Sequence, residues 1–110
     1  MVSEAAGRAV SVRLCAVGDI AEGEILRVDL EDGRALAVYH LEGAFYATDD
    51  LCTHGDASLA EGEIEGCNIL CPFHLGSFDI RTGEPTGAPC SVALRTYVVT
   101  VEDGEVLLTS

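Results

Sequence analysis

The sequence predicts an all-β protein, and three features of the chain support this fold class. Short apolar runs, several alternating with polar residues, recur roughly every eight to twelve residues and are separated by turn signals. No stretch has a sustained helical hydrophobic period. With 110 residues, 48% of them hydrophobic, the chain can bury one core without disulfide support. We therefore expect a single domain over residues 1–110, built as a small β-sandwich or barrel.

The first half of the chain is expected to form four strands joined by acidic and glycine-containing turns. Apolar and polar residues alternate in residues 24–30, which is typical of a half-buried strand. EDG (31–33) and EGAF (42–45) are the expected turns. The expected strands are AVSVRLCAV (9–17), EILRVDL (24–30), RALAVYHL (34–41) and FYATD (45–49).

The end of the chain is expected to form a β-hairpin. RTYVVTV (95–101) and EVLLTS (105–110) are β-type runs, and EDG (102–104) supplies an Asp-Gly turn between them.

The middle of the chain, approximately residues 50–89, differs from the rest because it is rich in Gly, Cys and Pro. Its β-type runs are short: EIEGCNIL (63–70) and GSFDI (76–80). We expect a loop-rich subdomain carried on the sandwich. TGEPTGAP (82–89) is expected to be a rigid loop, because Pro85 and Pro89 remove backbone donors from any ladder.

The charge of the chain excludes one class of partner. The net charge is −13, lysine is absent, and residues 19–65 contain thirteen acids against two arginines. Nucleic acid is therefore a poor partner, because phosphate binding needs a basic face. An acidic surface serves solubility in general, and it steers a partner with a basic patch if the protein carries a redox centre.

The sequence predicts a soluble cytoplasmic protein. No apolar run reaches the length of a membrane span, and the start of the chain lacks the basic and apolar regions of a secretory signal. Five unevenly spaced cysteines suit a disulfide scaffold poorly, and cytoplasmic cysteines more often serve metals or redox chemistry.

Two Cys-His pairs are the strongest chemical signal in the sequence. Cys52 and His54 form Cys-x-His, and after sixteen residues Cys71 and His74 form Cys-x-x-His. Coincidence is a poor explanation for two such pairs. A structural zinc ion is an alternative, because two cysteines and two histidines can bind zinc. However, zinc modules usually pair Cys with Cys and His with His. A two-iron cluster fits better, because each mixed pair can place its thiolate on one iron and its imidazole on the other.

These motifs resemble those of the Rieske [2Fe-2S] proteins. CTHG (52–55) and CPFHLGSFD (71–79) carry the resemblance at this separation. The flanks, from GEILRVDL through RTGEPTGAPC, are similar to the ferredoxins of bacterial aromatic-ring dioxygenase systems of the naphthalene and carbazole types. The resemblance covers roughly residues 14–108.

The resemblance implies a ligand set for one [2Fe-2S] cluster. Cys52 and Cys71 would bind the inner iron as thiolates, and His54 and His74 would bind the outer iron through one ring nitrogen each. The loop from Pro85 to Pro89 would pack over the cluster.

The residues beside the ligands depart from the respiratory-complex members of the family. The places of an inter-loop disulfide hold Ala57 and Phe73, and the places of two hydroxyl donors hold Gly76 and Phe78. Fewer donors stabilise the reduced cluster less, so we expect a potential of about −150 mV, low for a Rieske centre.

The resemblance implies an electron carrier rather than an enzyme. It would pass one electron from an NAD(P)H-dependent, flavin-containing ferredoxin reductase to a terminal oxygenase, working as a monomer. Two alternatives stay open: a small subunit of a nitrite-reductase-type enzyme, and a zinc-stabilised β interaction module. Four further residues are expected to be structural only, with Cys67 in a strand: Cys15, His40, Cys67 and Cys90.

Overall fold

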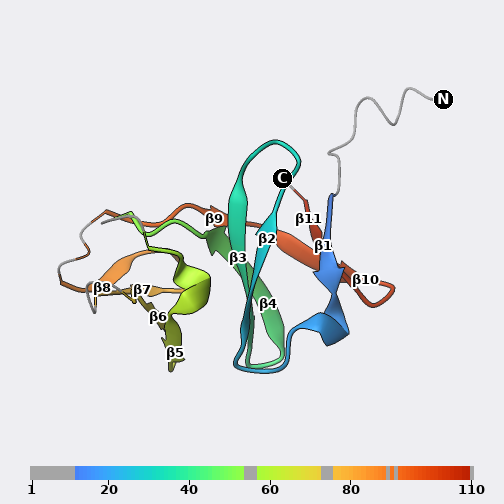
Figure 1. Ribbon diagram of the computed structural model, residues 1–110. Coiled ribbons are helices and arrows are strands. Elements are labelled where there is room, and N and C mark those ends of the chain that lie inside the picture. The colour runs from blue at the N-terminus through green and yellow to red at the C-terminus, as the bar shows by residue number, and fades with distance from the viewer. Residues whose placement is uncertain (1–11, 54–56, 73–75, 89, 91, 110) are drawn as a thin grey trace.

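The computed structural model describes residues 12–53, 57–72, 76–88, 90 and 92–109. Within these residues the chain forms eleven strands in three antiparallel sheets, with two short 3-10 helices between them (Figure 1). The predicted all-β class is therefore confirmed. None of the helices in the described part of the chain is long and apolar enough to cross a membrane.

The first sheet joins the two ends of the described chain in the order β1-β11-β10. It consists of β1 (Val12–Ala16), β10 (Val99–Glu102) and β11 (Glu105–Leu108). The expected hairpin is present, because β10 pairs with β11 around Asp103 and Gly104. Both turn residues have positive φ, 53° and 79°, as a two-residue hairpin turn of this hand requires.

The second sheet is the centre of the molecule and has the order β2-β3-β4-β9. Its strands are β2 (Ile25–Asp29), β3 (Ala35–Leu41), β4 (Ala44–Asp49) and β9 (Thr96–Tyr97). The expected single strand at 95–101 is wrong, because the chain changes sheet at Val98: β9 pairs with β4, whereas β10 pairs with β11. One segment therefore contributes to both sheets of the sandwich.

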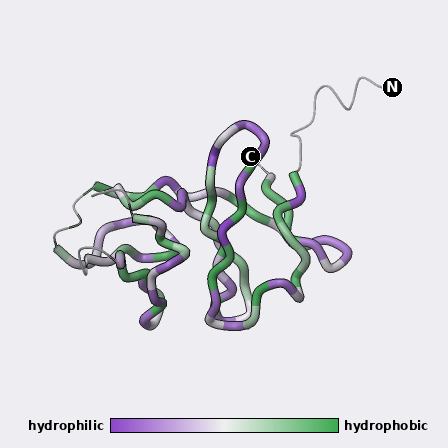
Figure 2. The backbone as a smooth tube through the Cα atoms, in the orientation of Figure 1, coloured by the Kyte–Doolittle hydropathy of each residue, from purple (hydrophilic) through white to green (hydrophobic). Residues whose placement is uncertain are grey.

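Strand β3 is buried on both faces, which explains its nearly continuous apolar sequence. Leu36 and Val38 pack into a core with β1 and β11, which contribute Leu14 and Val106. The alternate residues of β3 point the other way and pack into a second core: Ala37, Tyr39 and Leu41. Figure 2 shows hydrophilic residues gathered at the turns that join β2 to β3 and β10 to β11.

The third sheet, in the order β5-β6-β7-β8, lies at one end of the molecule, away from β1 and β10 (Figure 1). Its strands are β5 (Glu63–Glu65), β6 (Asn68–Leu70), β7 (Ser77–Asp79) and β8 (Pro85–Gly87). Its apolar residues, among them Ile69 and Phe78, share the second core with β3.

Two expectations for this sheet are wrong in detail. Residues 63–70 are not one run, because Gly66 adopts a φ of +63° and turns the chain between β5 and β6. Cys67 therefore lies in a turn rather than a strand, where its carbonyl accepts the Ile80 N–H at 2.9 Å. Pro85 begins strand β8 instead of a rigid loop, because β8 is the edge strand, where a first-residue proline is tolerated.

Candidate metal centre

The two cysteine loops are closed by the same backbone bond. The N–H of Cys52 donates to the carbonyl of Ala57 at 3.0 Å, and the N–H of Cys71 donates to the carbonyl of Gly76 at 2.8 Å. Both bonds join residue i to residue i+5, so the two loops have the same span. The first loop follows β4, and the second joins β6 to β7.

Cys52 and Cys71 are brought together in one apolar core. They are 2% and 0% exposed and pack in the same cluster as Ala57 and Phe78. A buried thiolate is costly unless a cation neutralises it, so this pair of thiols fits a metal centre better than isolated anions. His54 and His74 lie outside the described residues, and their role as ligands stays a prediction.

A third cysteine joins this pair, although no motif in the sequence assigns chemistry to it. Cys90 is 6% exposed and packs in the same core. Burial raises the pKa of its thiol, a side-chain hydrogen bond with Cys52 lowers it, and the charge of Cys71 raises it. The Cys90 thiol therefore shares one buried core with both predicted cysteine ligands.

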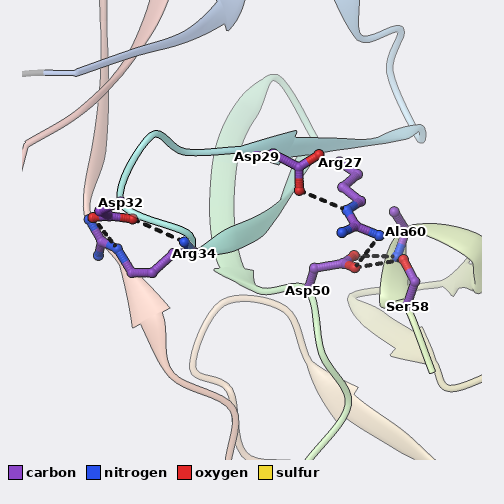
Figure 3. A network of polar contacts seen from close by, with 7 residues as sticks. All are labelled: Arg27, Asp29, Asp32, Arg34, Asp50, Ser58 and Ala60. Atoms are coloured by element: carbon purple, nitrogen blue, oxygen red, sulfur yellow. Dashed lines mark hydrogen bonds and ion pairs between the residues drawn. The ribbon is translucent and has the colours of Figure 1, made fainter. Parts of the chain in front are cut away.

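A buried carboxylate anchors the first cysteine loop, and the sequence reasoning missed it. Asp50 is 3% exposed and accepts hydrogen bonds from the hydroxyl of Ser58 at 2.6 Å and from the N–H of Ala60 at 2.9 Å. Nη1 of Arg27 on β2 lies 3.9 Å from Asp50 Oδ2, the same oxygen that accepts from Ser58 (Figure 3). The carboxylate thus joins the loop to the central sheet.

The first cysteine loop is also tied to the segment after β8. The hydroxyl of Thr53 donates to the carbonyl of Val92 at 2.6 Å. Two exposed apolar residues flank this contact: Leu51 is 58% exposed and Val92 is 62% exposed. The two loops and the segment beyond β8 therefore meet at one end of the molecule.

Residues 10–98 match the family described as the Rieske [2Fe-2S] domain. The chain belongs to this family. The ferredoxin component of the p-cumate 2,3-dioxygenase system of Pseudomonas putida is 53% identical over 98 residues, covering 88% of this chain and 83% of the relative. The naphthalene 1,2-dioxygenase ferredoxin component of Pseudomonas putida is 44% identical over 97 residues, covering 88% of this chain and 92% of the relative.

A solved structure agrees with these relatives. A chain in the complex of reduced oxygenase and oxidized ferredoxin of carbazole 1,9a-dioxygenase has a TM-score of 0.86 and 44% identity, over 92% of this chain and 94% of that chain. The predicted Rieske-type cluster is confirmed, and so is the assignment of this Rieske protein as an electron-transfer component that is not itself an enzyme.

The two alternative functions are weaker than this assignment. Two chains described as nitrite reductase small subunits share the fold at TM-scores of 0.79 and 0.82, but their identities of 24% and 19% carry the fold alone. The family assignment also replaces the zinc-stabilised interaction module with a [2Fe-2S] protein.

The two positions compared above with the hydroxyl donors of respiratory members lie beside the second cysteine loop. Phe78 is fully buried and Gly76 has no side chain, so neither carries a hydroxyl donor. The hydroxyl between them belongs to Ser77, and it bonds to Thr86 Oγ1 at 2.8 Å on β8. Ala57 is buried, and Phe73 lies outside the described residues.

The remaining residues singled out by sequence have structural roles. His40 lies on β3, where its Nδ1 is 2.9 Å from the carbonyl oxygen of Ile20 and its ring stacks on Phe45. Cys15 is a buried residue of β1.

Proposed function

We propose that this Rieske protein carries single electrons from an NAD(P)H-dependent, flavin-containing ferredoxin reductase to the terminal oxygenase of an aromatic-ring dioxygenase system. The observation that carries the proposal is the buried Cys52–Cys71 pair, set in a chain that resembles the ferredoxin components of such systems along most of its length. The aromatic substrate would bind to the oxygenase and never to the carrier.

The proposed cluster ligands are Cys52 and Cys71 for one iron and His54 and His74 for the other. The buried thiols supply two negative charges, and neutral imidazoles supply none, which raises the potential relative to an all-cysteine cluster. When bound, the [2Fe-2S] cluster supplies one-electron redox chemistry. The chain itself supplies two matching loops, the anchor at Asp50, and an apolar environment around the thiolates.

The proposed docking surface is the acidic end of the molecule beside the second cysteine loop. Glu61, Glu63 and Glu65 are exposed on or next to β5, and Pro72 lies close to Glu61 and Glu63 in a shared surface pocket. These carboxylates would meet basic patches on the reductase and on the oxygenase in turn. We place the working protein in the cytoplasm as a monomer, since a mobile carrier must release each partner.

Reconstitution tests this function directly. The experiment combines the holoprotein with a purified NADH-dependent flavin ferredoxin reductase and the terminal oxygenase of the p-cumate system, and it measures NADH oxidation together with hydroxylated product. We expect product to form only when all three proteins are present, and to be lost in Cys71→Ser but kept in Cys15→Ser. Reduction by the reductase without any product from this or from naphthalene- and carbazole-type oxygenases would contradict the proposed electron acceptor.

A further inference from the structure

The thiol of Cys90 occupies the space beside Gly76 where any other residue would place its side chain. A Cβ built on Gly76 would lie 2.5 Å from Cys90 Sγ, 3.0 Å from the carbonyl oxygen of Gly87 and 3.1 Å from Cys90 N. The φ angle of Gly76 is not in the left-handed region, so space alone demands glycine here. Gly76 and Cys90 are therefore a matched pair, and a serine at position 76 does not fit beside this thiol.

The backbone holds Cys90 at this position. Its N–H donates to the carbonyl of Gly87 at 3.1 Å, which closes the turn after β8. Gly87 itself pairs with Ser77 on β7, one residue after Gly76, whose carbonyl closes the second cysteine loop. The thiol is thus fixed against the second loop by its own backbone.

The same thiol reaches the first loop. Cys90 packs in the same buried core as Cys52 and Cys71, and a side-chain hydrogen bond with Cys52 lowers the pKa of its thiol, as a bond received from Cys52 does. As an iron-bound thiolate, Cys52 would instead accept this bond, because a thiolate carries no proton to donate. A donor aimed at a ligand sulfur withdraws negative charge from a cluster and favours the reduced state, which is the more negative one.

We propose that Cys90 is a positioning residue of the cluster, whose S–H donates a hydrogen bond to the iron-bound sulfur of Cys52 and raises the reduction potential in place of a hydroxyl at position 76. This inference rests on the proposed ligand assignment for Cys52. The inference assigns a role to a cysteine that lies outside both Cys-His motifs. It also explains why position 76 is a glycine, since the Cys90 thiol fills the space beside it.

The test is the midpoint potential of Cys90→Ala and Cys90→Ser, measured by anaerobic redox titration beside the wild type. Cys15→Ala is the matched control, because Cys15 is an equally buried thiol in the other core. We expect Cys90→Ala to weaken electron binding about threefold to tenfold, as loss of one modest hydrogen bond would, which is ~30–60 mV at 59 mV per tenfold change. The potential of Cys90→Ser should lie above that of Cys90→Ala, and Cys15→Ala should match the wild type.

Spectroscopy separates this role from simpler ones. The EPR spectrum of the reduced variants should keep the Rieske form, and the S–H stretching band of Cys90 in the wild type should shift in the infrared when the cluster is reduced. The wild-type protein carries this infrared measurement, and Cys90→Ser is used only to assign the band. A potential unchanged in Cys90→Ala, or an S–H band indifferent to reduction, would overturn the proposal.

Two other outcomes have separate meanings. Conversion of the EPR spectrum to another cluster type in Cys90→Ala would make Cys90 a ligand and overturn its role as a donor. A wild-type protein without a Rieske EPR signal would overturn the ligand assignment itself, and with it the basis of this inference.

Discussion

At the scale of the residue, the site depends on how tightly small side chains pack around two buried thiols. Cys52, Cys71 and Cys90 share one core, and Gly76 is the residue that leaves room for the third of them. This arrangement is not local in sequence, because the pairing of β7 with β8 brings Cys90 to Gly76 in the second cysteine loop. The spacing of the motifs predicted the two cysteine ligands, but it held no signal for the third cysteine.

The contact at Gly76 leads to the first prediction. Gly76→Ala places a Cβ 2.5 Å from Cys90 Sγ, so we expect overpacking to destabilise the holoprotein by about 1–3 kcal/mol. Thermal unfolding, followed by loss of the visible cluster absorbance, measures the effect. Gly18→Ala is the control, because nothing lies within 4 Å of a Cβ at that position. Adding Cys90→Ala to Gly76→Ala should recover part of the loss; equal melting of the single and double variants would contradict the contact.

At the scale of the element, the cysteine loops are held by anchors in the sandwich. Asp50 is the main one, because its carboxylate binds Ser58 and Ala60 and reaches Arg27 on β2 (Figure 3). Two neighbouring acids, Asp49 and Asp50, precede Leu51 and Cys52 in the sequence, and only the fold shows that they have different roles. Asp49 accepts from Tyr97 in the central sheet, whereas Asp50 turns toward the loop.

Removal of the Asp50 carboxylate is the second prediction. Asp50→Ala leaves the buried donors of the loop without an acceptor, and we expect a loss of about 2–4 kcal/mol together with faster cluster release. Chelator-induced bleaching of the visible spectrum measures the release rate. Asp29→Ala is a matched control, because Asp29 also contacts Arg27, at 3.1 Å, but its side chain is 70% exposed. Equal bleaching rates in the two variants would contradict the anchor.

The turn between β3 and β4 supplies a prediction about pH. The N–H groups of Gly43 and Glu42 hold the pKa of the Glu22 carboxyl below its usual range, because both donate to its ionised form. A lowered folded pKa contributes stability that is present above the unfolded pKa and is lost as the pH falls through the folded pKa. Glu22→Gln should therefore flatten the acid side of the stability profile in urea unfolding, whereas Glu31→Gln, in an exposed turn, should not. An unchanged acid slope in Glu22→Gln would contradict this role.

Local sequence patterns predicted most of the strands. The predictions that were wrong are those that depend on pairing between distant segments. Alternation and Asp-Gly turns located β2, β3, β4 and the β10–β11 hairpin closely. The sequence does not show that the strand is divided at Val98, because all of RTYVVTV suits a β-strand. The two halves differ only in the strands with which they pair. Strand β8 was missed because the cost of Pro85 depends on whether its strand lies at an edge, which the sequence alone does not reveal.

At the scale of the whole molecule, negative charge is distributed over a small carrier with its redox site at one end. The net charge is −13. Glu63 and Glu65 lie on β5 of the sheet that carries the second cysteine loop, and Glu61 ends the short 3-10 helix before β5. The β10–β11 turn, with Glu102, lies toward the opposite end (Figure 1). Charge that guides docking should therefore matter at the first end more than at the second.

Salt dependence is the fourth prediction. Electrons should pass to the oxygenase more slowly as ionic strength rises, because a Debye length of about 10 Å at 0.1 M screens the steering field. Stopped-flow oxidation of the reduced carrier measures the second-order rate. Glu63→Lys should lower this rate and weaken its salt dependence, whereas Glu102→Lys makes the same charge change at the other end and should have little effect. Equal effects of the two variants would show that only the net charge matters, and would contradict docking at the end that carries Glu63.

The most direct test of the central claim is pulsed EPR of the dithionite-reduced protein, prepared with unlabelled histidine and with histidine labelled with nitrogen-15. A Rieske cluster held by Cys52, Cys71, His54 and His74 predicts coupling of two imidazole nitrogens to the iron spin, each changing with the label. A reduced iron-sulfur signal without any histidine coupling, or a colourless protein with stoichiometric zinc, would contradict it.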